Sequence, residues 1–373
     1  MKIRTSIILL YLMLHFSCFS VHSQSLKIDS LIKETLDKYS ITGLSIAIVK
    51  TDTFLFNKGY GYESIENNTL ADINTNFYIA SLTKAMTAYG IGILVDSKML
   101  NWSDPIYKYL NNIQFNEPYS KMVTISDLLS MNLGSPYMDT LINYPKLSET
   151  ELHKEITLHH LPNYRKSNYY GQGANTGFYL AGKVIESVTG IDYTEFLTDS
   201  LLKPIQMNNT YFSNADSTII NNCASPYKYA DGTIKKLQYP NLGHYISAAG
   251  VISNALDLSN WLKLILKIDY DRTLLNKETL NKLFYPHNIL LKNQKFLFNP
   301  YSLYNLYGYG WVLSEYHGNL LAEHLGIVDG YTNLIAVIPE EKIGIVILTN
   351  YSSDNIIIGL RDLKFGIIEH LTK

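Results

Sequence analysis

The chain has 373 residues, which is long enough to bury one large hydrophobic core or two moderate ones. Hydrophobic residues make up 46% and charged residues 17% of the sequence, which excludes an intrinsically disordered chain. The formal net charge of −2, without any run of like charges, provides no field that would attract nucleic acid, so we expect no nucleic-acid partner.

The first residues have the pattern of a secretory signal. Lys2 and Arg4 precede an apolar run over residues 7–19, and small residues then lead to Ser23. We therefore expect residues 1–23 to be a signal peptide that is cleaved between Ser23 and Gln24. The mature protein is then expected to be periplasmic or secreted.

Two other fates of the N-terminus remain open. The apolar run is short for a membrane span, which takes about 20 apolar residues, so an uncleaved anchor is the less expected alternative. Lipidation at Cys18 is also less expected, because the three preceding residues are not the usual small and aliphatic ones. After cleavage only Cys223 remains, which excludes an intramolecular disulfide and favours a small buried side chain.

Apolar patterning predicts strands near both ends of the chain and helices between them. Helical spacing is expected over residues 28–39, 81–95, 126–131, 178–188 and 356–371. Short apolar or alternating runs predict strands over residues 44–49, 53–57, 310–314, 319–323, 332–338 and 344–348.

This order predicts an α/β (α+β) domain over residues 24–373. One antiparallel sheet is built from both chain ends and flanked by helices, and a mainly helical lobe is inserted into it. The sheet lobe is expected over about residues 24–95 and 245–373, and the helical lobe over about 96–244. A ligand site is expected in the cleft between the two lobes.

Ser81 and Lys84 form a Ser-x-x-Lys pattern that also occurs three more times in the chain, so context has to distinguish them. Ser81 begins a strongly apolar helix, where free N–H groups and the helix dipole favour negative charge. Lys84 lies one turn along the same face, and apolar neighbours would lower its pKa until the amine accepts the serine proton. The alternative is that Ser81 is a helix N-cap and Lys84 a solvated surface residue.

A second candidate lies at the end of a predicted strand, in His324-Leu325-Gly326. Glycine there permits a ligand to approach the backbone closely. The N–H of Ile327 would then join that of Ser81 in a two-donor oxyanion hole. The alternative is a histidine that is simply hydrogen-bonded at the edge of a strand.

A third candidate is the glycine-rich loop over residues 169–175, which carries two phenols and the amides of Gln172 and Asn175. A tyrosinate near a lysine ammonium acts as a general base, and an amide orients an acyl substrate. No metal-ligand spacing, phosphate loop or Gly-x-Ser-x-Gly elbow occurs, so we expect no metal and no cofactor.

Taken together, several segments resemble the serine β-lactamase-related family of class C β-lactamases, D-alanyl-D-alanine carboxypeptidases and related esterases. They occur in the order in which the family has them. The segments are residues 41–49, 59–61, 77–84, 204–210, 249–258, 324–326, 330–331 and 345–350. The resemblance implies the β-lactamase/transpeptidase-like fold and an acyl-enzyme mechanism, with Ser81 as nucleophile and with Lys84 and a tyrosine moving the proton.

Two departures from the family pattern concern the chemistry. His324 stands where the family usually has the lysine of Lys-Thr-Gly, which removes a permanent charge suited to a substrate carboxylate. Gly173 stands where a gap-free match places the family tyrosine, so either Tyr170 substitutes for it or this base is missing. We favour Tyr170.

These observations predict an exported serine hydrolase that acts on small esters, amides or D-amino-acid peptides, with Ser81, Lys84, Tyr170 and His324 as catalytic residues. Asn175, Gln172, Gly326 and Ile327 are expected to bind the small-molecule or peptide substrate. β-Lactamase activity is less expected. The alternative is a non-catalytic or slowly acylating protein that binds cell-wall fragments or β-lactams, and a membrane-anchored scaffold requires an uncleaved N-terminus.

Overall fold

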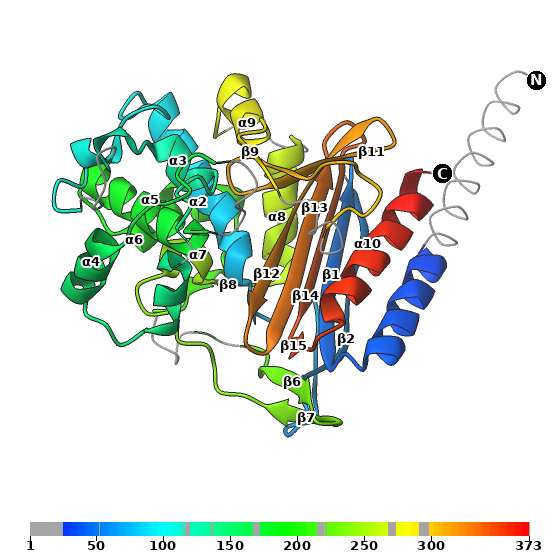
Figure 1. The fold of residues 1–373 in the computed structure, drawn as a ribbon. Coiled ribbons are helices and arrows are strands. Elements are labelled where there is room, and N and C mark those ends of the chain that lie inside the picture. Colours follow the sequence, from blue (N-terminus) through cyan, green and yellow to red (C-terminus); the bar gives the residue numbers. More distant parts are fainter. Residues whose placement is uncertain are drawn as a thin grey trace, which may run out of the picture.

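The computed structural model describes residues 25–51, 53–113, 115, 120–135, 137–166, 172–214, 220, 222–267, 274–290 and 298–372 (Figure 1). The predicted signal peptide, Cys18 and Tyr170 lie outside these residues. Within them, no helix combines the length and apolar character that a membrane span requires.

The centre of the molecule is an antiparallel sheet of nine strands whose members come from both ends of the chain. In spatial order these are β3 (Thr69–Leu70), β2 (Thr53–Ser64), β1 (Gly43–Lys50), β14 (Ile343–Thr349), β13 (Tyr331–Ile338), β12 (Asn319–Val328), β11 (Val312–Tyr316), β10 (Leu306–Tyr307) and β9 (Asn288–Ile289). The fold predicted from the sequence is confirmed.

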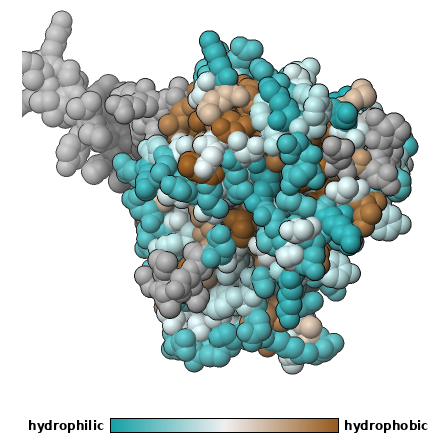
Figure 2. All heavy atoms as spheres, turned by 90° about the vertical axis from the view of Figure 1, so that its left-hand side faces the viewer, coloured by the Kyte–Doolittle hydropathy of each residue, from teal (hydrophilic) through white to brown (hydrophobic). Residues whose placement is uncertain are grey.

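Helices and short turns occupy most of the chain between the two sheet segments. They are η1 (Ala80–Leu82), α2 (Thr83–Asp96), η2 (Ile106–Lys108), η3 (Ser120–Met122), α3 (Ile125–Leu129), η4 (Met138–Asn143), α4 (Glu149–Leu158), α5 (Ala174–Thr189), α6 (Tyr193–Leu197), η5 (Thr198–Leu202), η6 (Lys203–Ile205), α7 (Ile246–Ala249), α8 (Ala255–Leu266) and α9 (Lys277–Leu283). A helix over residues 25–39 and α10 (Ile356–Thr372) complete the set. The side of the molecule formed by α4, α5 and α6 is mostly hydrophilic (Figure 2).

Both faces of the sheet are covered by helices. Side chains that alternate along each strand therefore belong to two hydrophobic clusters. Along β1, Ile46 and Ile48 join the cluster under α10 and the helix over 25–39, whereas Ala47 and Val49 join the cluster under α8 and the central helices. Figure 1 shows the two sets of helices on opposite sides of the sheet. This burial gives the central strands their near-continuous apolar sequences.

The central region contains more strand than the sequence indicates. The additional short strands are β4 (Phe77–Tyr78), β5 (Tyr211–Phe212), β6 (Tyr227–Ala230), β7 (Thr233–Lys236), β8 (Val251–Ser253) and β15 (Tyr351–Ser352). β6 and β7 form a hairpin around Asp231 and Gly232, whose φ angles of 53° and 78° suit a two-residue turn. β4 pairs with β8 and leads directly into η1, which fixes where the first site residue lies.

Candidate active site

Ser81 lies in η1, between β4 and α2. The residue before it, Ala80, has a φ of 49°, in the left-handed region that residues with a Cβ rarely adopt. Such strained backbone is held in place by its surroundings and is concentrated at functional sites. Ser81 is partly exposed and lines a cavity of about 610 Å³, so a ligand can reach it.

Four parts of the chain form this cavity together with Ser81: η4 and the residues after it, the start of α5, the segment over residues 237–242 with α7, and the end of β12. Apolar side chains and amides make up most of its wall. They include Ile142, Asn143, Gln238, Asn241, Leu242 and Val328. Among the described residues of the wall, Asp329 is the only one with a charged side chain.

Lys84 is buried next to Ser81, with only 1% of its surface exposed. Its Nζ atom lies 2.8 Å from Ser81 Oγ, 2.8 Å from Asn175 Oδ1 and 2.9 Å from the carbonyl oxygen of Ala248. Burial lowers the pKa of Lys84 to about 7, while the negative charge of Asp139 acts in the opposite direction. Lys84 is therefore no solvated surface residue, and the serine hydroxyl faces this amine rather than capping α2.

These three contacts suit both protonation states of Lys84. As an ammonium, Nζ donates one proton to each of the three oxygens. As a neutral amine, it donates its two protons to Ala248 and Asn175, which leaves the lone pair directed at the Ser81 hydroxyl. The arrangement therefore positions the neutral amine to accept the serine proton and stabilises the ammonium that results.

Asn175 is placed by the N-terminus of α5, where one carboxylate accepts from three successive N–H groups. Asp139 accepts from Gly173 and Asn175 at 2.8 Å and from Ala174 at 3.2 Å. Burial raises the pKa of Asp139, whereas the backbone donors and the charge of Lys84 oppose this effect. Sequence reasoning missed Asp139, since no local pattern connects η4 with α5.

His324 is also buried, in β12, and only 3% of it is exposed. Its Nδ1 atom lies 2.7 Å from the carbonyl oxygen of Leu325, which can only accept, so Nδ1 carries the proton. Nε2 then accepts from the Tyr307 hydroxyl at 3.0 Å. Burial, followed by the charge of Lys84, lowers the pKa of His324 to about 3. The imidazole is therefore neutral, so this position lacks the positive charge that a lysine would bring. His324 does not line the cavity.

The end of β12 reaches the cavity through Gly326 and Ile327. A Cβ atom on Gly326 would collide with the carbonyl oxygen of Ile79, so only glycine lets β12 pack against η1. Ile327 is 49% exposed and lines the same cavity as Ser81. The predicted oxyanion donors, the N–H groups of Ile327 and Ser81, thus belong to residues on one cavity.

The remaining predicted residues lie in the loop before α5. The side-chain oxygen of Gln172 accepts from Asn163 Nδ2 at 3.0 Å, and Gln172 is not part of the cavity wall. Tyr170 lies outside the described residues. Gly173 has a φ of 83°, and an added Cβ would lie 3.0 Å from Leu133, so a tyrosine at this position would be strained. The loop has therefore a backbone conformation suited to glycine at the position where the sequence match puts the family tyrosine.

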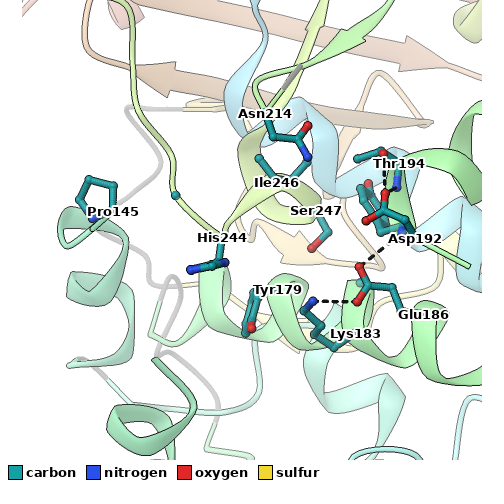
Figure 3. A pocket seen from close by; sticks show the side chains of 13 residues that line it. Pro145, Tyr179, Lys183, Glu186, Asp192, Thr194, Asn214, His244, Ile246 and Ser247 are labelled. Carbon is teal, nitrogen blue, oxygen red and sulfur yellow. Dashed lines mark hydrogen bonds and ion pairs between the residues drawn. The ribbon is translucent and has the colours of Figure 1, made fainter. Parts of the chain in front are cut away.

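A second cavity, of about 390 Å³, is lined by residues of α5, α6 and α7 and by neighbouring loop residues (Figure 3). Ser247 lines this cavity, while Ala249 lines the one beside Ser81. Its lysine, Lys183, is already paired with Glu149 at 2.5 Å and with Glu186 at 2.7 Å. Lys183 is therefore shared between two carboxylates, and its ion pair with Glu149 ties α5 to α4. The described residues hold no cluster of possible metal ligands here or elsewhere.

The profile of the family described as Beta-lactamase matches residues 28–355. The chain belongs to this family. Among curated proteins it is 29% identical over 355 residues to Protein flp of Staphylococcus aureus (strain MW2), covering 92% of this chain and 66% of that protein. It is 25% identical over 361 residues to Unguisins hydrolase ungD' of Aspergillus campestris (strain IBT 28561), covering 90% and 64%. The chain thus spans just under two thirds of these relatives.

Two solved structures have a similar fold. The octameric penicillin-binding protein homologue from Pyrococcus abyssi matches with a TM-score of 0.74 and 27% identity, over 91% of this chain and 76% of that one. The D-amino acid amidase from Ochrobactrum anthropi SV3, in complex with L-phenylalanine amide, also has a TM-score of 0.74, at 21% identity over 92% and 98% of the two chains. The family resemblance stated from the sequence is confirmed.

Proposed function

We propose that this Beta-lactamase family member is a serine hydrolase that works through an acyl-enzyme, with Ser81 as nucleophile and Lys84 as base. The observation that carries the proposal is the environment of Lys84 Nζ. Two acceptors, Ala248 O and Asn175 Oδ1, leave the lone pair of the neutral amine for the Ser81 hydroxyl 2.8 Å away. Burial makes this neutral form abundant near pH 7, because it lowers the pKa of the amine to about 7.

The reaction follows from these positions. Ser81 Oγ forms a bond to the carbonyl carbon while its proton moves to Lys84 Nζ, and the negative oxygen is stabilised by the N–H groups of Ser81 and Ile327. The carbon–leaving-group bond then breaks, and the leaving group takes the proton. Water attacks the acyl ester by the same route in reverse and frees the serine. We propose Tyr170 as a second proton carrier and His324 as the neutral neighbour of the lysine.

The wall of the cavity supports small esters, amides or D-amino-acid peptides as substrates. Its described side chains are apolar groups, amides and one carboxylate, Asp329, and the nearby His324 is neutral. A substrate carboxylate finds no cation among these residues apart from buried Lys84. β-Lactams and peptides with a free carboxyl end are therefore disfavoured. The name of one structural neighbour, a D-amino acid amidase, is consistent with amide substrates, and the name of one relative, Unguisins hydrolase ungD', is consistent with hydrolysis.

The location that we propose is periplasmic or secreted. It rests on the signal pattern of residues 1–23, with its basic start and short apolar run. N-terminal sequencing of the mature protein from the producing cell tests this, since a chain that begins at Gln24 is the expected result. A chain that begins at Met1, or at a modified Cys18, would contradict cleavage at this position.

Intact-mass spectrometry after treatment with an activated ester tests the proposed function. Wild-type protein is expected to gain one acyl group, located at Ser81 by peptide mapping, and Ser81→Ala is expected to gain none. Ser200→Ala is a matched control, because Ser200 and Lys203 have the same spacing, Ser200 is also partly exposed, and Lys203 is an exposed residue. No adduct on the wild type, or an equal adduct on Ser81→Ala, would contradict the proposal.

A slowly acylating binding protein is the second candidate, and Gly173 in place of the family tyrosine is the observation that favours it. Such a protein forms the same adduct at Ser81, but turnover stops there because water is not activated. The two functions differ in the lifetime of the acyl group, which time-resolved mass spectrometry measures. Release within the time of one assay supports the hydrolase, and a stable adduct supports the binding protein.

A further inference from the structure

Asp139 is a partly buried carboxylate that the proposed proton transfer does not use. It lies on η4, and three backbone N–H groups of residues 173–175 donate to its two oxygens at 2.8 to 3.2 Å. The last of these donors is the backbone of Asn175, whose side chain accepts from Lys84. One carboxylate thus connects directly to the residue that orients the catalytic amine.

The turn that carries Asp139 also forms one wall of the substrate cavity. Ile142 and Asn143, on the same 3-10 turn, line the cavity that Ser81 opens into. A further hydrogen bond, from Thr176 Oγ1 to the carbonyl oxygen of Met138 at 2.9 Å, holds the start of this turn on α5. The cavity wall and the amide of Asn175 are therefore fastened to each other at the N-terminus of α5.

We infer that Asp139 is a positioning residue, which holds Asn175 against Lys84 and fixes the η4 wall of the substrate cavity. The inference rests on the proposed function. Asp139 itself touches neither Ser81 nor the cavity, so it acts through Asn175 and through the turn that it anchors. Its contacts are backbone groups, which explains why no side-chain pattern in the sequence revealed it.

The charge of Asp139 provides a readout that a purely structural role lacks. Besides Ser81, the groups of the described residues that face Lys84 are Asp139 from η4, Asn175 and the Phe178 ring from α5, Ala248 from α7 and His324 from β12. His324 is neutral and does not offset the charge of Asp139. The negative charge of Asp139 stabilises the ammonium form of Lys84. Removing that charge lowers the pKa of Lys84 further and makes the amine a base at lower pH.

The experiment compares Asp139→Asn with wild type in the acylation of Ser81 by p-nitrophenyl acetate, followed from pH 5 to pH 10. We expect the acidic limb of the rate profile to move down by about one pH unit. The plateau rate is expected to fall about tenfold, because the amide donates where the backbone needs an acceptor and Asn175 is displaced. Asp257→Asn is the matched control, since Asp257 is a buried carboxylate that accepts from Asn209 N at 2.8 Å, outside the cavity.

The outcomes distinguish failure of the inference about Asp139 from failure of the proposed function. A lower plateau without movement of the limb, or an effect equal to that of Asp257→Asn, would overturn the inference and leave a structural role. If wild type itself is not acylated, the proposed function fails instead. Should Asp139→Asn not fold, Asp139→Glu keeps the charge but displaces the backbone of residues 173–175. It is expected to keep the limb and lose about tenfold in rate, and a wild-type rate would overturn the inference.

Discussion

The carbonyl oxygen of Ala248 accepts a hydrogen bond from Lys84 Nζ at 2.9 Å, and this contact decides how the amine is oriented. A backbone carbonyl cannot donate, so one N–H of Lys84 is committed to α7 in either protonation state. The carboxamide of Asn175 takes a second. The third N–H of the ammonium, or the lone pair of the neutral amine, is directed at Ser81.

Replacing Lys84 by methionine keeps most of its volume and removes the base. We expect the rate of Ser81 acylation to fall by about 10³-fold, within the range of general acid–base catalysis. The measurement is single-turnover release of p-nitrophenolate. Lys203→Met is the control from the surface Ser-x-x-Lys pair, and it is expected to retain the wild-type rate because Lys203 is exposed. A rapid reaction in Lys84→Met would exclude the lysine as base.

The pH dependence of acylation should report the pKa of Lys84, which burial lowers from 10.5 to about 7. Below this pH the amine is protonated and cannot accept the serine proton, so the rate is expected to fall about tenfold per pH unit. Above it the neutral amine predominates and the rate levels off. kcat/KM for an uncharged ester, measured from pH 5 to pH 10, gives the value for the free protein. A limb near the ordinary lysine pKa would contradict the lowering of the Lys84 pKa by burial.

Tyr170→Phe tests the second proton carrier. If Tyr170 takes the role of the family tyrosine, whose position is occupied by Gly173, loss of the Tyr170 hydroxyl is expected to lower kcat by about 10²-fold. Tyr169→Phe is the natural control, since it removes a phenol from the same loop. An unchanged rate in Tyr170→Phe would mean that Lys84 moves the proton without help from this residue.

Charge selection by the cavity can be measured with three anilides of D-phenylalanine that carry a free amine, an N-acetyl group or an N-succinyl group. Asp329 at the rim is expected to favour the cation over the anion in kcat/KM by about fivefold, as exposed charges contribute little. Asp329→Asn should remove most of that difference, and 0.5 M salt should do the same by screening. Equal rates for all three substrates would exclude Asp329 as a determinant.

A buried ion pair on the far side of the sheet concerns stability rather than catalysis. Lys364 on α10 lies 2.5 Å from Glu323 on β12, and their side chains are 0% and 1% exposed. Lys364→Met leaves the carboxylate buried without its partner, so the free energy of unfolding is expected to fall by about 3–5 kcal/mol. Adding Glu323→Leu should recover most of this loss. Urea unfolding of both single variants and of the double variant measures the coupling.

Local patterns in the sequence were sufficient for the central strands and for the principal pair of the site. Short apolar runs placed β13 and β14, because both faces of these strands are covered. Three residues of helical spacing bring Lys84 beside Ser81 wherever the helix packs. The β6–β7 hairpin was missed although Asp231-Gly232 is a two-residue turn signal, because its strands are short and exposed.

The chain itself thus determined which hydroxyl and which amine are neighbours, since that contact lies within one helical turn. Tertiary structure alone decided that the amine is buried, that Ala248 and Asn175 occupy its two N–H groups, and that Asp139 holds the start of α5. These partners are 36 to 164 residues distant from the groups they bind, and two of the contacts use the backbone, which has no residue-specific signature. Desolvation, which shifts the pKa of Lys84, is likewise a property of the packed molecule and of no single segment.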